Sequence, residues 1–128
     1  MSAVASGSVE LSETEFQAIA DATLGAIECA AGALDDTIER GFDLSVAAGV
    51  LTLKLGDGRG TYVLNKQTPN RQIWWSSPVS GPKRYAWDAQ SQMWANTRDG
   101  HSMIALLRKE IEHLTGVQLD LGEKSGEA

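Results

Sequence analysis

A single cysteine, Cys29, is present among the 128 residues of this chain. One cysteine cannot form a disulfide within the chain, and it cannot build a cysteine-based zinc or iron–sulfur site. No apolar run approaches the ~20 residues that a membrane-spanning helix needs, so we expect no membrane association. Cys29 itself is predicted to be a plain thiol on the solvent side of a helix.

Catalytic motifs are also absent. The sequence has no nucleophile–base pair, phosphate-binding glycine loop or paired-carboxylate motif of a hydrolase. The two histidines, His101 and His113, have no carboxylate or thiol at catalytic spacing, and we expect capping or surface roles for both. The sequence therefore favours a binding protein over an enzyme. The first ten residues are neither Arg-rich nor apolar, so we expect any organelle-targeting segment to lie outside this sequence.

What the chain does contain is enough apolar side chain, 42% of its residues, for one folded domain. We predict that this domain spans residues 11–121 and that flexible segments flank it at 1–10 and 122–128. The net charge is −6, yet ten acids accompany two bases between Glu10 and Asp57, and eight bases accompany two acids between Gly58 and Lys109. Such a bipolar distribution would orient encounters with charged partners.

A long first helix is predicted at the beginning of the domain. Ser12 and Glu15 match the S-x-x-E capping box, and Leu11 with Phe16 can form a hydrophobic staple. Apolar residues then recur with a helical period, and Gly41 is a suitable residue to end the helix.

Short strands follow, separated by turn residues. Ser102 and Gly116 then bound a second helix, and the alternating segment 117–121 is expected to cover apolar surface. This order predicts an α+β fold: a two-layer sandwich with an N-terminal helix, an antiparallel meander of about six strands and a C-terminal helix, both helices on one face of the sheet. The predicted strands are 42–46, 50–55, 61–67, 71–77, 84–88 and 93–97.

Carboxylates along the first helix and just beyond it form a candidate metal site, which we call the acidic ridge. At 100° per residue, Asp21, Glu28, Asp35 and Glu39 fall within about 80° of Glu13 on one side of the helix, and Asp36 and Asp43 extend this group. Oxygen ligands suit hard cations, and a cation relieves the repulsion between carboxylates. With no histidine or cysteine at ligand spacing, iron binding would be weak, surface-bound and open to competing divalent cations. The alternative is an ordinary solvated helix face. The acidic ridge comprises Glu13, Asp21, Glu28, Asp35, Asp36, Glu39 and Asp43.

The sheet face that the helices leave uncovered, the open face, is the second candidate surface. Trp74 and Trp75 are neighbours in one predicted strand, so their side chains point to opposite faces. We assign Trp75 to the core and Trp74 to the open face. A tryptophan among amides with a basic edge has the composition of a protein interface. The predicted partner-binding residues are Asn65, Lys66, Gln67, Trp74, Lys83 and Arg84, with Arg71 also at the basic edge.

The run NKQTPNRQIW-SSP-SGPKRY-W, residues 65–87, closely resembles the frataxin family, and the similarity extends from about residue 11 to 121. The sequence of this run is similar to the eukaryotic branch of the family, which implies a location in the mitochondrial matrix. The resemblance implies that Asn65, Lys66, Gln67, Trp74 and Arg84 contact the iron–sulfur scaffold protein. It also associates the acidic ridge with iron. Non-acidic residues stand where the family usually has acids, which argues against high-capacity iron binding: Gly25, Cys29, Gly32 and Ala33.

Three functions remain in competition. The leading hypothesis, implied by the resemblance, is an iron-binding regulatory protein, monomeric when free. It would dock on the cysteine desulfurase–scaffold complex and accelerate persulfide transfer for iron–sulfur cluster assembly as an allosteric activator. The alternative is an iron chaperone or ferroxidase that delivers or oxidises Fe²⁺ through the acidic ridge. Nucleic-acid binding by an aromatic, basic sheet is the third; the net charge of −6 argues against it, because phosphate contacts dominate such affinity.

Overall fold

Helix α1 (Glu13–Ala31) begins with the predicted capping box in the computed structural model, which describes residues 11–121. The Ser12 hydroxyl accepts a hydrogen bond from the Glu15 amide at 3.1 Å, and the Glu15 carboxylate accepts one from the Ser12 amide at 3.0 Å. Two amides that the first turn leaves free are thereby satisfied. The predictions for segments 1–10 and 122–128 lie outside the described residues.

The predicted end of the first helix at Gly41 is wrong. The α-helix ends at Ala31, and the chain continues as a 3₁₀ helix, η2 (Gly32–Asp36), before an irregular connection to the sheet. Gly25 and Gly32 weaken the C-terminal half, and a tighter turn still buries Leu34. The α-helical angles assumed for Asp35, Asp36 and Glu39 therefore do not apply.

Six antiparallel strands form one sheet in chain order, which confirms the predicted meander. Tight turns impose this order, and the β2–β3 turn is a two-residue one in which Ala48 and Gly49 have positive φ values of 54° and 78°. A short 3₁₀ turn, η3 (Thr68–Asn70), joins the fourth strand to the fifth. The strands are β2 (Phe42–Ala47), β3 (Val50–Leu55), β4 (Thr61–Gln67), β5 (Gln72–Ser77), β6 (Gly81–Asp88) and β7 (Met93–Asn96).

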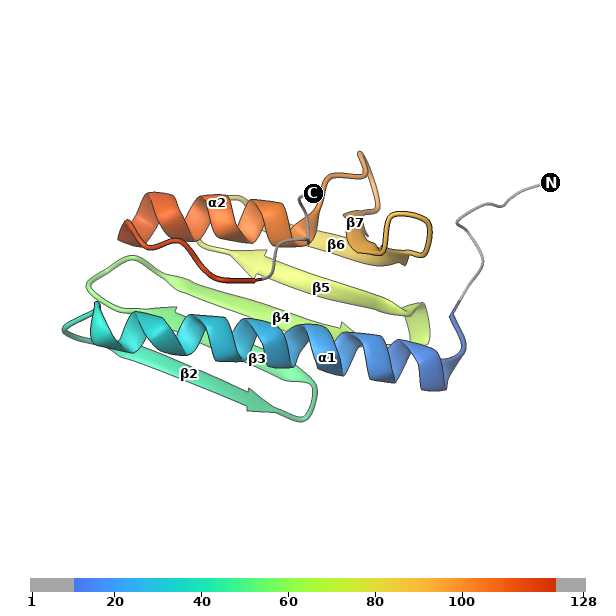
Figure 1. Ribbon diagram of the computed structural model, residues 1–128, viewed down its shortest axis with the longest axis horizontal. Helices are drawn as coiled ribbons and strands as arrows, with labels where there is room; N and C mark the ends of the chain where they lie inside the picture. The colour runs from blue at the N-terminus through green and yellow to red at the C-terminus, as the bar shows by residue number, and fades with distance from the viewer. Residues whose placement is uncertain (1–10, 122–128) are drawn as a thin grey trace.

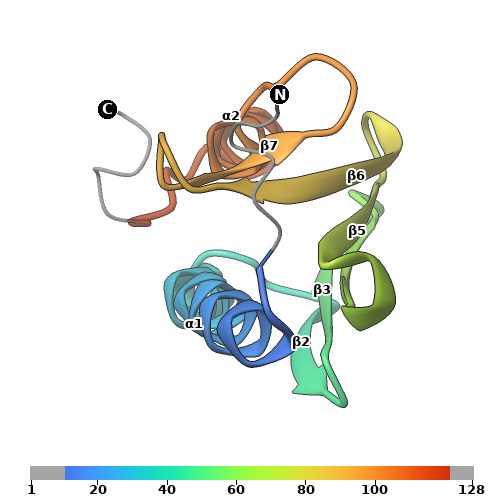
Figure 2. The same cartoon turned by 90° about the vertical axis from the view of Figure 1, so that its right-hand side faces the viewer.

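Helix α2 (Met103–Thr115) has the predicted ends, with Ser102 accepting from the Ala105 amide and Gly116 in the left-handed region at φ 78°. Both helices cover the same face of the sheet, as the two views show (Figures 1 and 2). The other face has no layer over it among the described elements. No helix in residues 11–121 combines the length and the apolar character needed to cross a bilayer.

The core lies between the helices and the sheet. As predicted, Leu64, Ile73 and Trp75 are buried in it, and alternating leucines of β3 are fully buried beside them. The segment after α2 covers part of the same core, because Leu119 is only 3% exposed, which confirms its predicted role. Trp94 joins the far edge of the sheet to α1, with its indole nitrogen 2.8 Å from the Thr23 hydroxyl.

Candidate functional site

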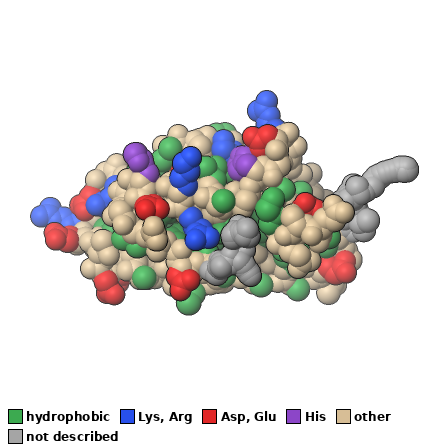
Figure 3. All heavy atoms as spheres, turned by 45° about the horizontal axis from the view of Figure 1, so that its top comes forward, with side chains coloured by type: hydrophobic (Ala, Val, Ile, Leu, Met, Phe, Trp, Pro, Cys, Tyr) green, Lys and Arg blue, Asp and Glu red, His purple; other side chains and the backbone are tan. Residues whose placement is uncertain are grey.

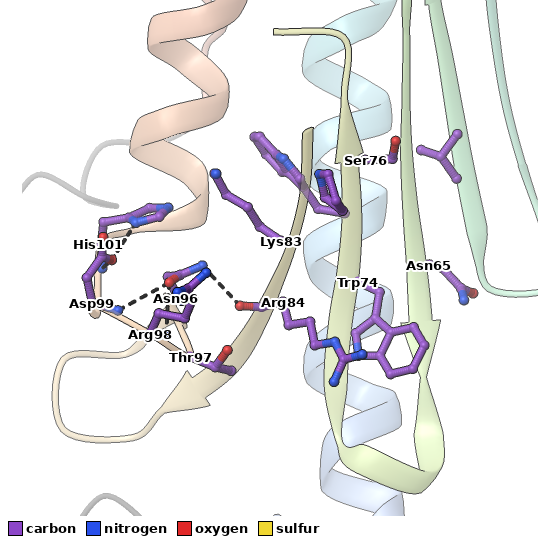
Figure 4. Close-up of a pocket in the computed structure, with 13 residues that line it drawn as sticks. Asn65, Trp74, Ser76, Lys83, Arg84, Asn96, Thr97, Arg98, Asp99 and His101 are labelled. Carbon is purple, nitrogen blue, oxygen red and sulfur yellow. Dashed lines mark hydrogen bonds and ion pairs between the residues drawn. The ribbon is translucent and has the colours of Figure 1, made fainter. Parts of the chain in front are cut away.

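Trp74 is the centre of a row of side chains that crosses three strands on the open face. Strand pairing places Asn65 of β4 and Arg84 of β6 on either side of it. The Arg84 guanidinium carbon lies 4.4 Å from the centroid of the Trp74 ring, a cation–π distance (Figure 4). The Trp74 indole nitrogen donates to the Gln72 side chain at 2.8 Å. These two contacts hold a partly buried ring in one orientation before any partner arrives.

The amides beside this row are also ordered. The Asn65 side chain donates to Gln67 at 3.4 Å, so both amides lie along β4 on the open face. We call Asn65, Gln67, Trp74 and Arg84 the tryptophan row. On such a surface the aromatic ring can be buried against a partner at the centre of the contact. The amides and the guanidinium around it can form hydrogen bonds with the partner's backbone groups.

Lys66 does not lie on the open face, so its predicted place at the basic edge is wrong. It pairs in register with the buried Ile73, and its ammonium forms a 2.6 Å ion pair with Asp21 of α1. Strand alternation directs its side chain to the helix side, next to the Asn65 side chain that points the other way. One predicted partner-binding residue is thereby paired with one predicted metal ligand.

Lys83 and Arg71 have hydrogen-bond partners of their own near the edges of the sheet. Lys83 pairs with the buried Trp75, its ammonium donates to the Ser80 carbonyl at 3.3 Å, and it borders the same hollow as Trp74 and Arg84 (Figure 4). The Arg71 guanidinium donates to the carbonyls of Leu11 and Thr68, which ties the η3 turn to the start of α1. Arg84 alone of the four predicted edge bases contacts Trp74.

A hollow of about 1030 Å³ adjoins the tryptophan row, and the 97–101 loop forms its other wall (Figure 4). Asn96, which is 8% exposed, holds this loop in place. Its side-chain oxygen accepts from the amides of Arg98 and Asp99, and its side-chain nitrogen donates to the Arg84 carbonyl. The loop and the strand that carries Arg84 are therefore fixed relative to each other.

His101 has partners that the sequence analysis missed. Its Nδ1 lies 2.6 Å from the Asp99 carboxylate, and its Nε2 lies 2.8 Å from the Tyr85 hydroxyl. Hydrogen bonds from the His101 amide and ring hold the pKa of Asp99 below its ordinary value. Burial, and then the charge of Glu110, raise the pKa of Tyr85. The Asp-x-His spacing of residues 99–101 is the sequence signal from which the contact between Asp99 and His101 could have been predicted. His113 is exposed in the last turn of α2.

A buried carboxylate, Glu110, was also missed. It is 5% exposed, and one of its oxygens accepts from the hydroxyls of Tyr62 and Ser77, each at 2.6 Å. Burial and the hydrogen bond to Glu110 raise the pKa of Tyr62. This network joins α2 to β4 and β5 within the core, so we assign it to stability.

The acidic ridge is dispersed. Its carboxylates lie on α1, on η2, in the connection to the sheet and on β2, and all of them are exposed. No group of three or more histidine, cysteine, aspartate or glutamate side chains within residues 11–121 is arranged to hold a metal ion. The ridge is therefore not a preformed iron site. Cys29 is exposed and free on α1, as predicted.

Charges of both signs are interspersed on the face seen in Figure 3, where acidic and basic side chains lie among one another over the helix side. The division of charge along the sequence is therefore not reproduced there as two separate poles. The meander itself keeps β2 and β3 of the acidic segment side by side, and the two segments meet where Lys66 of β4 pairs with Asp21 of α1.

Comparisons with known proteins agree with the geometry. Mitochondrial frataxin of Arabidopsis thaliana is 46% identical over 112 residues, which cover 87% of this chain and 59% of that protein. Mitochondrial frataxin of Dictyostelium discoideum is 49% identical over 81 residues, 63% of this chain and 42% of that protein. The chain thus spans about half the length of these relatives. Caenorhabditis elegans mitochondrial frataxin is 40% identical over 105 residues, with 80% and 76% covered.

Solved structures show the same fold. Trimeric frataxin from the yeast Saccharomyces cerevisiae, described as complexed with ferrous, superposes with a TM-score of 0.67 at 34% identity, covering 77% of this chain and 87% of that one. Frataxin from Psychromonas ingrahamii reaches a TM-score of 0.70 at 20% identity, covering 88% and 100%, which supports the fold alone. The family model for the frataxin-like domain matches residues 9–117. The chain therefore belongs to the frataxin-like domain family.

Proposed function

We propose that this protein docks through its open face on the cysteine desulfurase–scaffold complex and accelerates persulfide transfer during iron–sulfur cluster assembly. One observation carries the proposal: Trp74 is fixed by Gln72 and Arg84 on a sheet face that no described element covers. The names of the relatives, mitochondrial frataxins, support the expected location in the mitochondrial matrix.

The fixed orientation of Trp74 favours binding because little side-chain freedom remains to be lost. Ordering a free side chain on association costs on the order of 1 kcal/mol, and here Arg84 and Gln72 have already ordered the ring. Tryptophan and arginine are also the residue types that most often dominate interface energies. The contact we propose consists of the tryptophan row, with Lys83 at the border of the adjoining hollow, whereas Lys66 is paired with Asp21 on the helix side.

The experiment is capture of the purified desulfurase–scaffold complex by wild type, Trp74→Ala and Ser76→Ala. Ser76 is exposed on the open-face side of the same strand, so it is the matched control. We expect Trp74→Ala to weaken binding by about 2 kcal/mol or more, roughly thirtyfold, with a change in stability below about 0.5 kcal/mol. Sulfide production by the complex should fall in parallel. Unchanged capture by Trp74→Ala, with the fold intact, contradicts the proposal.

Iron handling is the second candidate, because a similar solved structure is described as a frataxin complexed with ferrous. We propose weak Fe²⁺ binding at exposed carboxylates of the acidic ridge, where relief of repulsion is the driving force. Mn²⁺, Co²⁺ and Ca²⁺ should compete, since the ligand set excludes none of them. The protein would then deliver or oxidise iron that is bound weakly at this surface, and not iron held in a preformed site with a fixed set of ligands.

Nuclear magnetic resonance titration with Fe²⁺ tests iron binding directly. We expect broadening of the amides around the ridge carboxylates Glu28, Asp35 and Asp36, reversed by excess Ca²⁺. Asp21 should respond less than these, because Lys66 already neutralises it at 2.6 Å. Broadening confined to His101 and His113 would show that iron binds histidine instead.

A further inference from the structure

The outer edge of β2 is a second candidate interaction surface. Strand β2 is the first strand in the sheet order and pairs only with β3, and nothing lies alongside its outer edge in Figure 1. At the opposite margin, β7 has only four residues, and a bridge between Ala95 and Ser102 closes part of it. The six residues of β2 therefore form the longer free edge of the described sheet.

The register shows which backbone groups point outward. A two-residue turn closes the β2–β3 hairpin, so Ala47 and Val50 form a hydrogen-bonded pair, and every second pair after them does too. Phe42, Leu44 and Val46 occupy the alternate positions. Their amide and carbonyl groups consequently face away from β3, in the arrangement that accepts an additional strand.

The same three residues supply an apolar strip beside this edge. Their cross-strand partners in β3 are leucines that are 0% exposed, so the three side chains lie on the helix side of the sheet. Phe42 and Leu44 pack against the core at its margin, while Val46 remains 37% exposed. An added strand could place every second side chain against this strip and extend the core outward. No proline or lysine of the kind that protects natural edges occurs in β2.

The charges around the β2 edge favour a basic partner. Four carboxylates lie on or near the edge: Asp43 on β2, Asp35 and Asp36 on the adjoining η2, and Glu39 in the connection. Two bases, Arg40 and Lys54, accompany them, so the edge carries excess negative charge. Two copies of this chain, each with a net charge of −6, would meet edge to edge with like charges. A basic segment of another protein would instead be attracted by the negative charge of this edge.

We propose that the β2 edge binds an extended, basic segment of another protein by strand addition, with apolar side chains of that segment alternating with lysine or arginine. Backbone hydrogen bonds would supply affinity, and the apolar strip with its carboxylates would supply selectivity. This surface is separate from the tryptophan row, so both can be occupied together, and the proposal does not depend on the function proposed above.

The probe is a capped peptide of alternating valine and lysine, as long as β2. We expect the peptide to slow hydrogen exchange at the amides of Phe42, Leu44 and Val46 and to bind Trp74→Ala as well as wild type. Two further peptides carry N-methyl groups on the backbone nitrogens of one edge or of the other. Because only one edge can pair with β2, one of them should bind about tenfold or more weakly than the parent, and the other should be little affected.

Val46→Pro is the matching change in the protein, with Val46→Thr as its control. The Val46 amide points outward, so proline removes a donor for the added strand and leaves the β2–β3 ladder intact. We expect Val46→Pro to weaken peptide binding about tenfold and Val46→Thr to retain it. Equal behaviour of the two methylated peptides, absence of binding or of exchange protection, or self-association through this edge overturns the proposal.

Discussion

Replacement of Glu110 by alanine should destabilise the protein because this buried carboxylate joins two layers. Glu110 is 5% exposed and accepts hydrogen bonds from Tyr62 and Ser77 at 2.6 Å each. Hydrogen bonds to a charged group contribute about 1.5–3 kcal/mol each. Removing the carboxylate also removes the cost of burying its charge, which offsets part of that loss. We expect a net decrease of about 2–4 kcal/mol in the free energy of unfolding at neutral pH.

The free energy of unfolding is measured by urea denaturation followed by tryptophan fluorescence. Glu110→Gln is the matched control, because it keeps an oxygen acceptor without the charge, and it should lose less than half as much. Combining Glu110→Ala with Tyr62→Phe should give a coupling energy of about 1–3 kcal/mol, as for residues in direct contact. A Glu110→Ala protein as stable as wild type, or a coupling energy near zero, would refute the reasoning.

Two further predictions concern the buried aromatic residues. Trp75→Ala should lose about 3–5 kcal/mol of stability in the same urea assay. The reason is that Trp75 is 2% exposed and lies between the rings of Tyr62 and Tyr85, each at a centroid distance of 5.6 Å. A loss below about 1 kcal/mol would contradict its core position. Burial raises the pKa of both tyrosines above the ordinary 10.0, so their contribution to stability is complete below that pH and is lost as pH rises above it. Tyrosinate absorbance should appear together with unfolding, and ionisation that precedes unfolding would contradict this assignment.

Local signals in the sequence predicted most of the fold. Capping residues located both helix starts, and period-two alternation located the strands and separated Trp74 from Trp75. The end of α1 was missed because an α turn and a 3₁₀ turn differ little in local energy, and tertiary packing of Leu34 decides between them.

The candidate site was predicted less completely, and for a different reason. A lysine in a strand reads as exposed, yet the partner of Lys66 is Asp21, 45 residues earlier on another layer. Glu110 reads as part of the polar side of α2, and only its packing against Tyr62 and Ser77 makes it a core residue. Contacts between distant segments are set by how the layers meet, and a periodicity argument contains no such information.

The meander also has a consequence for how the protein folds. Each strand of the sheet pairs with the strand next to it in the chain, so the sheet can grow one hairpin at a time with short loops to close. The contact between Trp94 and Thr23 joins residues 71 positions apart. Because closing so long a loop costs the most entropy until the intervening strands have formed, we expect this contact to form late. We therefore expect the sheet to assemble first and the first helix to close the core afterwards, although that helix precedes the sheet in the chain.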